Sequence, residues 1–116
     1  MTEKYEKGQE GENIAAEFLS RKGYHILEKN YRAGQLELDL ITRHKECLVF
    51  VEVRLRKNAD YGYPETSMSK AKIAAVKRAA QVYLNKTNWT GDIRFDMIAI
   101  VEKPTLEIEH FEDAYF

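Results

Sequence analysis

The chain has 116 residues, of which 44% are hydrophobic and 32% charged, a composition typical of one globular domain rather than of a disordered or membrane-embedded chain. Its single cysteine excludes an internal disulfide framework and favours a reducing, cytoplasmic location. No apolar run approaches the roughly 20 residues that span a bilayer, and the net charge of −1 argues against binding driven by overall charge.

The first predicted element is a helix over residues 8–22, because apolar side chains recur there at three- and four-residue spacing and Gly23 is a natural stop. Glu12 lies at the edge of the apolar stripe. An acid at this position either points at the neighbouring sheet or, as a first-turn residue, interacts with the helix dipole. Residues 24–28 are expected to form the first strand, and residues 29–33 a loop or an extension of it.

The next two strands are predicted at residues 36–43 and 48–55, with a turn between them. Both faces of the second of these strands are apolar at its start, so we expect it to be central and covered on both sides. Residues 56–67 then carry glycine, proline and asparagine, which predicts a long loop, and long loops in compact domains are often functional.

The remaining elements are a second helix at residues 70–84, capped by Ser67 or Ser69, and strands at 93–101 and 105–110. The order is therefore helix, three strands, helix, two strands. This order predicts an α/β or α+β domain with a mixed sheet of about five strands and a helix on each face.

Acidic and basic side chains gather where the second and third strands would pair. Because side chains alternate between the faces of a strand, Glu37 and Asp39 share one face of the second strand. By the same rule Glu52 and Arg54 share one face of the third. Glu12 of the first helix is a further acid that could reach this patch.

A divalent metal is the usual reason for such a group of acids. If the turn pairs Arg43 with Leu48, Asp39 lies opposite Glu52, with Cβ atoms about 5 Å apart. Mg²⁺ prefers oxygen ligands, usually one or two carboxylates with water or phosphate, and the backbone carbonyl of Val53 could join them. The helix acid could bind through a metal-bound water. The alternative is a structural ion cluster without metal.

Hydrolysis of a phosphodiester needs charge neutralisation, an activated water and a stabilised leaving group, and Mg²⁺ can contribute to all three. Arg54 could contact the scissile phosphate. Basic side chains are concentrated in residues 54–86, which hold eight bases and two acids, and these form either a phosphate-binding surface or a solvated helix face. The candidates for contacts with flanking phosphates are Arg56, Lys57, Lys70 and Lys72.

Several segments together resemble a known family. GxxGE near the start, GYHILEKNYR, GQLELDLI, LVFVEVRLR and RFDMIAI occur in the order and spacing of the bacterial YraN-type family of predicted endonucleases. The resemblance covers about residues 8–116. The family belongs to the PD-(D/E)xK nuclease superfamily and is similar to archaeal Holliday junction resolvases.

The resemblance implies a restriction-endonuclease-like core and one endonuclease-like domain over residues 1–116. It also implies a metal-dependent endonuclease that hydrolyses DNA, including branched or damaged DNA, with Mg²⁺ as cofactor and Mn²⁺ as a substitute. Resolvase-like enzymes act as dimers, so the analogy leaves a homodimer open. No membrane partner is expected.

Residue by residue, the resemblance assigns the helix acid to Glu12, the metal-binding aspartate to Asp39 and the motif acid to Glu52. The motif lysine falls on Arg54, which is a departure, because arginine stays charged and cannot serve as a general base. That departure keeps two alternatives open. One is a noncatalytic nucleic-acid-binding module that retains the nuclease fold, and the other is a protein-partner-binding domain.

Overall fold

The computed structural model describes residues 3–62, 64 and 66–114. Within them, neither helix combines the length and the apolarity that a membrane span requires. The elements follow the order predicted from the sequence. They are α1 (Glu3–Arg21), β1 (His25–Ala33), β2 (Leu36–His44), β3 (Cys47–Asn58), a 3₁₀ turn at Ala59–Tyr61, α2 (Lys70–Thr87), β4 (Asp92–Lys103) and β5 (Glu107–Phe111).

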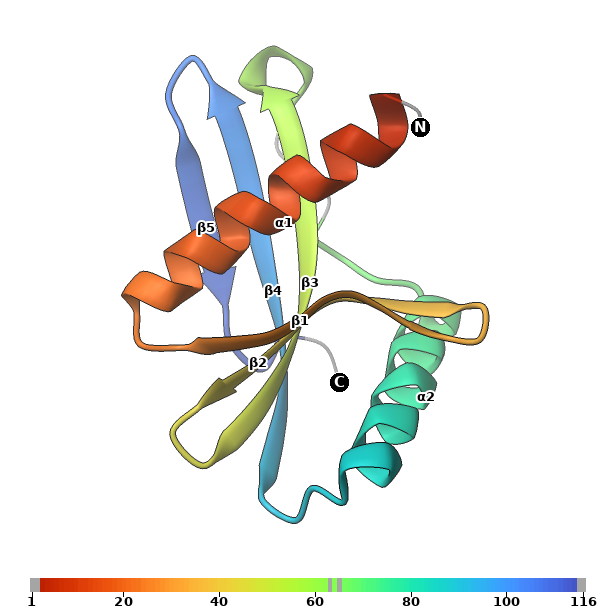
Figure 1. Ribbon diagram of the computed structural model, residues 1–116. Coiled ribbons are helices and arrows are strands. Elements are labelled where there is room, and N and C mark those ends of the chain that lie inside the picture. Colours follow the sequence, from red (N-terminus) through yellow and green to blue (C-terminus); the bar gives the residue numbers. More distant parts are fainter. Residues whose placement is uncertain (1–2, 63, 65, 115–116) are drawn as a thin grey trace.

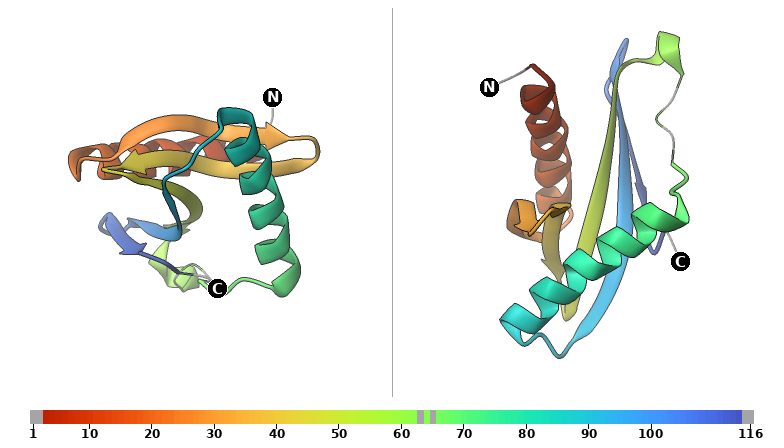
Figure 2. Two further views of the ribbon diagram at one scale, coloured as in Figure 1. Left: turned by 90° about the horizontal axis from the view of Figure 1, so that it is seen from below. Right: turned by 90° about the vertical axis from the view of Figure 1, so that its right-hand side faces the viewer.

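One five-stranded sheet, in the order β1-β2-β3-β4-β5, organises the molecule (Figure 1). Its pairs are antiparallel except β3 with β4, which run parallel and are joined through α2. The two helices lie on opposite faces of the sheet, as the right-hand view of Figure 2 shows. The predicted mixed α+β architecture with a helix on each face is therefore confirmed.

Strand β3 contributes side chains to the hydrophobic core on each face of the sheet, because its side chains alternate between the two faces. Val49 and Val51 pack with Leu19 of α1 on one face. Phe50 packs with Tyr83 of α2 on the other, where the two rings meet edge to face at 6.3 Å between centroids. The central position predicted for this strand is confirmed, and the charged residues that follow its apolar part stand at the margin of both cores.

Several element boundaries differ from those expected. Helix α1 begins at Glu3 rather than at residue 8, so Glu12 lies well inside the helix and the reading of it as a first-turn acid on the helix dipole is wrong. Of the two alternatives for residues 29–33, the strand extension is confirmed, because β1 continues to Ala33. Strand β3 continues to Asn58, into the segment predicted as a loop. The loop therefore begins later than the local glycine and proline content suggests.

The start of α2 is capped as predicted by one of the two candidate serines. Ser69 accepts a hydrogen bond from the Lys72 amide at 3.1 Å, which satisfies one of the free amides of the first turn. The helix is longer than expected and ends at Thr87. This cap places the first turn of α2, and with it Lys72, beside the charged part of β3.

The β2–β3 register is the one that the turn predicts. Arg43 pairs with Leu48, and the pairing continues to Leu40 with Val51. There the recorded ladder ends, and Figure 1 shows the β1–β2 hairpin turning away from the upper half of β3. The candidate acids Asp39 and Glu52 stand where these two strands separate.

Candidate active site

Asp39 occupies the gap that opens between β2 and β3. Its Oδ2 accepts a hydrogen bond from the backbone amide of Val53 at 2.8 Å, so its carboxylate replaces the missing strand pairing. The amide and carbonyl of one strand residue point to the same side of the strand. The Val53 carbonyl therefore faces the same gap as the Asp39 carboxylate.

A cleft of about 410 Å³ lies on the α1 side of this gap. Gly11 of α1 faces β3, where a Cβ added at this position would be in ordinary van der Waals contact with the Cβ of Leu55, at 3.4 Å. The cleft combines acidic, basic and amide side chains from the helix and three strands. Its lining residues are Gln9, Gly11, Glu12, Asn30, Arg32, Glu37, Asp39, Val53, Leu55 and Lys57.

Glu12 is an acid buried in this cleft, with 6% of its surface exposed. Its Oε1 has no hydrogen-bond partner, which is costly for a buried polar atom. Burial raises the pKa of Glu12 to about 7, against a hydrogen bond from the Asn30 side chain that lowers it, and the charges of Glu37 and Glu52 raise it further. The carboxylate is thus placed where a cation or a proton would stabilise it.

The pKa of Asp39 is also raised. Burial and the charge of Glu52 raise the pKa of Asp39 to about 8, the hydrogen bond from Val53 lowers it, and Glu12 adds a smaller increase. Lys72 lowers the pKa slightly. The three acids predicted as one group, from α1, β2 and β3, are therefore close enough to influence one another electrostatically.

Two cations meet the third acid on the α2 side of the sheet. The Glu52 carboxylate lies 3.4 Å from Arg54 Nε and 3.7 Å from Lys72 Nζ. Arg54 thus shares a face with Glu52 as predicted, and α2 adds the ammonium of Lys72. Arg56 and Lys70, the other proposed phosphate contacts on this side, are exposed.

The basic residues at the rim of the cleft are paired with acids. Lys57 lies 2.8 Å from a carboxylate oxygen of Glu10 and 3.7 Å from Glu102. Arg32 lies 3.4 Å from a carboxylate oxygen of Glu37. A phosphate approaching Lys57 would have to compete with two carboxylates.

The oxygen donors available to a metal ion at this gap are the carboxylates of Asp39, Glu52 and Glu12. In the described part of the chain, no three or more His, Cys, Asp and Glu side chains are grouped so that they could hold a metal by themselves. Mg²⁺ does not require such a cage, because it usually binds one or two carboxylates and keeps several waters. Asp39 and Glu52, with the unpartnered oxygen of Glu12 nearby, fit a partly hydrated Mg²⁺.

Asn30 and Arg32 line the cleft although the sequence did not single them out. Both belong to the segment interpreted as a loop or strand extension, where no periodic pattern marks which way a side chain faces. Asn30 has a left-handed backbone, with φ of 52°. The asparagine itself was a signal, because it is among the few residues other than glycine that adopt this conformation readily.

A second buried polar cluster lies on β4 and β5. Asp96 is fully buried. It accepts two hydrogen bonds of 2.9 Å from Arg94 and one of 3.0 Å from the Asp113 amide, and its Oδ2 lies 2.8 Å from His110 Nε2. Arg94 also donates to the Tyr24 hydroxyl at 2.7 Å. The Arg94–Asp96 bonds lie within β4, whereas the contacts with His110, the Asp113 amide and Tyr24 reach other segments, so the cluster anchors β4 to β5.

The chain is similar to proteins of one family. The model of the uncharacterised protein family UPF0102 matches residues 11–100. The chain is 44% identical to a UPF0102 protein of Cytophaga hutchinsonii, over 84% of this chain and 87% of that protein. It is 39% identical to a UPF0102 protein of Flavobacterium psychrophilum, over 100% and 98%, and 44% identical to one of Lawsonia intracellularis, over 95% and 85%.

Proposed function

The chain belongs to the uncharacterised protein family UPF0102, and from its site we propose that it is a metal-dependent endonuclease that hydrolyses DNA phosphodiester bonds. One observation carries the proposal. Three carboxylates from α1, β2 and β3 converge on the gap between two strands, and there burial and mutual repulsion raise the pKa values of Glu12 and Asp39. A divalent cation would relieve both effects.

Asp39, Glu52 and the Val53 carbonyl are the proposed ligands of Mg²⁺, for which Mn²⁺ would substitute, and Glu12 would bind through water. When bound, the ion supplies charge neutralisation at the phosphate and a more acidic water. The hydrogen bond from the Val53 amide fixes the orientation of the Asp39 carboxylate. Glu12 offers its unpartnered oxygen as an acceptor for the attacking water.

The cations of the site suit the phosphates of the substrate. Arg54 stays protonated and could bind a phosphate through two parallel hydrogen bonds. We therefore assign to it the stabilisation of negative charge in the transition state, and not proton transfer. Lys72, beside Glu52, would contact the same or the next phosphate. Arg56, Lys57 and Lys70 would contact flanking phosphates.

The proposed substrate is DNA, including branched or damaged DNA. A junction has two symmetric cleavage points, which a homodimer would match. This part of the proposal rests on analogy with resolvases.

Titration calorimetry with Mg²⁺ and Mn²⁺ tests the metal site directly. The wild type is compared with Asp39→Asn, which keeps the size of the side chain, and with Glu17→Gln, which removes an exposed acid that pairs only with Arg21 in the recorded ion pairs. We expect Asp39→Asn to lower the metal affinity at least about tenfold, because even indirect partners of metal ligands cost 10–100-fold. Glu17→Gln should bind as the wild type does.

The same titration is repeated with DNA present, since a phosphate completes many Mg²⁺ sites. Absence of metal binding under both conditions would contradict the proposal. Binding that is unchanged in Asp39→Asn would place the metal elsewhere.

A second candidate function, a noncatalytic nucleic-acid-binding module, is favoured by one observation. The position of the motif lysine holds Arg54, and its guanidinium lies against Glu52 at 3.4 Å. Such a module would bind DNA in a salt-dependent manner and leave it intact with either metal. A DNA that the wild type binds in a mobility-shift assay but does not cleave with Mg²⁺ or Mn²⁺ would support this alternative.

A further inference from the structure

Asn30 lines the same cleft as two of the candidate acids, Glu12 and Asp39. In the β1–β2 ladder, Lys29 pairs with Leu40 and Tyr31 with Leu38, so Asn30 occupies the register position opposite Asp39. Its side chain hydrogen-bonds the Glu12 carboxylate of α1. A single side chain of β1 thus contacts the helix acid from a register position opposite the strand acid.

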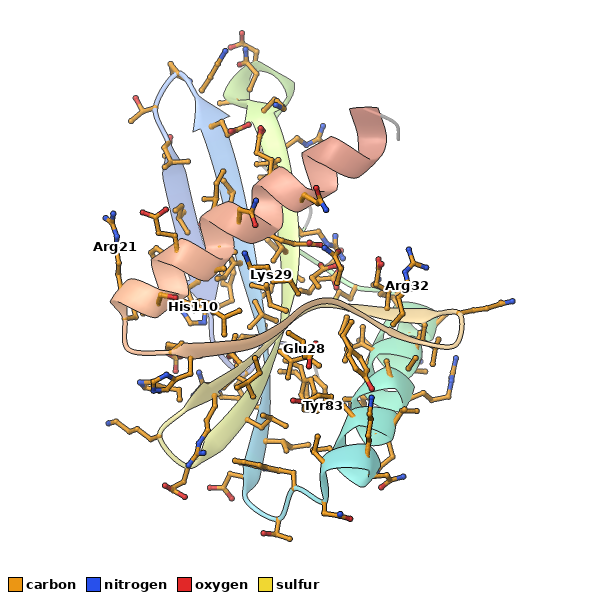
Figure 3. The ribbon with its side chains drawn as sticks, in the orientation of Figure 1. Arg21, Glu28, Lys29, Arg32, Tyr83 and His110 are labelled. Atoms are coloured by element: carbon orange, nitrogen blue, oxygen red, sulfur yellow. The ribbon has the colours of Figure 1, made fainter. Side chains whose placement is uncertain are left out.

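The backbone of Asn30 explains why it reaches α1. In a regular strand, residues 29 and 31 would project to the same face. Here Lys29 Nζ donates to Asn13 of α1 at 2.9 Å, and Figure 3 shows Lys29 on the α1 side of β1. Tyr31 instead packs edge to face on Tyr83 of α2, with 5.2 Å between ring centroids.

The left-handed conformation at Asn30, with φ of 52°, is where the alternation is broken. Its two neighbours are anchored on opposite helices, so the conformation is held from both sides. Non-glycine residues in this conformation are uncommon and carry some strain. The chain accepts that strain at a residue whose side chain contacts the most buried acid of the cleft.

We propose that Asn30 is a positioning residue that orients the Glu12 carboxylate toward the metal site of Asp39 and Glu52. The inference rests on the proposed function. Asn30 does not touch the metal or the reacting phosphate. It holds one side of the Glu12 carboxylate, which leaves Oε1 directed at a ligand, as partners behind a metal site commonly do.

The test uses two substitutions that tolerate the left-handed backbone. Asn30→Gly removes the amide and relaxes the backbone, and Asn30→Asp keeps the size but replaces the amide with a second acid. Asn88→Gly is the matched control, because Asn88 has nearly the same conformation, with φ of 54°, at the end of α2. Thermal unfolding establishes that all variants are folded.

The readouts are Mn²⁺ affinity by calorimetry and the separation of kcat from KM in DNA cleavage. For Asn30→Gly we expect Mn²⁺ affinity and kcat to fall about tenfold or more while KM stays close to the wild-type value. Asn88→Gly should match the wild type in both. Asn30→Asp should also lose kcat, because a carboxylate cannot donate the hydrogen bond to Glu12.

Failure of the inference can be told apart from failure of the proposed function. If the wild type binds Mn²⁺ and cleaves DNA, and Asn30→Gly does so equally well, the positioning role is overturned and the function stands. If the wild type neither binds Mn²⁺ nor cleaves DNA, both proposals fall. If Asn30→Gly and Asn88→Gly lose Mn²⁺ affinity and kcat equally, the loss comes from reduced stability, and the positioning role is also overturned.

Discussion

Asp39 and Glu12 hold protons more tightly than exposed acids do. Burial is the main cause for both, with the Glu52 charge as the second cause for Asp39. A protonated carboxyl group cannot bind a divalent cation, so protons and metal compete at the same atoms. The physical state of the site therefore depends on pH in the range where the two groups titrate.

The pH dependence of stability follows from these shifts. The folded-state pKa of Asp39, about 8, lies above its ordinary value of 3.8, so the folded state binds the extra proton. Between these pH values the unfolded chain loses its proton first, and the free energy of unfolding of metal-free protein falls as pH rises. We expect Tm in EDTA to fall from pH 5 to 8, and the gain in Tm from Mg²⁺ to grow over the same range.

Asp39→Asn is the variant that checks this assignment. It removes the titrating group, so the fall in Tm with pH should become shallower and the gain from Mg²⁺ should largely disappear. Scanning calorimetry at several pH values, with EDTA or Mg²⁺, measures both. An unchanged slope in Asp39→Asn would show that other groups set the pH dependence.

At the scale of elements, the site depends on how strands separate and are anchored. The β1–β2 hairpin leaves β3 after Leu40, which opens the gap, and the kink at Asn30 connects the hairpin to α1. On the other neighbour of β3, Asp96 of β4 receives hydrogen bonds from Arg94, His110 of β5 and the Asp113 amide. The Asp96 cluster keeps β5 and the following residues on the sheet.

Asp96→Asn should therefore destabilise the protein. It removes a fully buried charge and leaves the Arg94 guanidinium without its main partner, a loss of about 3 kcal/mol in the free energy of unfolding. Glu109→Gln, an exposed change beside His110, is the control. Urea denaturation followed by circular dichroism measures the difference, and equal midpoints for the two variants would contradict the anchoring role.

The Asp96 cluster also predicts a response to acid. Burial alone would raise the pKa of Asp96, but hydrogen bonds from His110, Arg94 and the Asp113 amide hold it below its ordinary value of 3.8. The stabilisation is thus present above that ordinary value and is lost as pH falls through the lower folded-state pKa. In Asp96→Asn, this part of the acid sensitivity should be absent.

At the scale of the whole molecule, charge is unevenly distributed. Basic residues of β3 and α2 meet beside the candidate site, whereas β5 and the residues around it carry Glu107, Glu109 and Glu112. A net charge of −1 therefore conceals a basic side and an acidic side. DNA would be steered toward the basic side, where Arg54 and Lys72 stand next to the acids.

This distribution predicts the salt dependence of DNA binding. Each phosphate contact adds roughly one to the slope of log affinity against log salt concentration, so Lys72→Gln should lower the slope by about one. Arg21→Gln, at the exposed end of α1 (Figure 3), should leave it unchanged. Fluorescence anisotropy at several salt concentrations measures the slopes, and equal slopes in all three proteins would remove Lys72 from the interface.

Local patterns in the sequence determined much of this architecture. Side-chain periodicity identified the order of helices and strands, the central position of β3 and the shared face of Glu52 and Arg54. The short β2–β3 turn determined the pairing of Arg43 with Leu48. These features are predictable because they depend on residues only a few positions apart.

Only the tertiary structure decided how the site is assembled. It buried Glu12 well inside α1, ended the β2–β3 ladder before Asp39, turned Asn30 toward the helix and brought Lys72 to Glu52. It also paired Lys57 with Glu10, a residue 47 positions away. These contacts join residues that are far apart in the chain. The burial of each acid depends on how whole helices and strands pack, and a local sequence pattern does not contain that information.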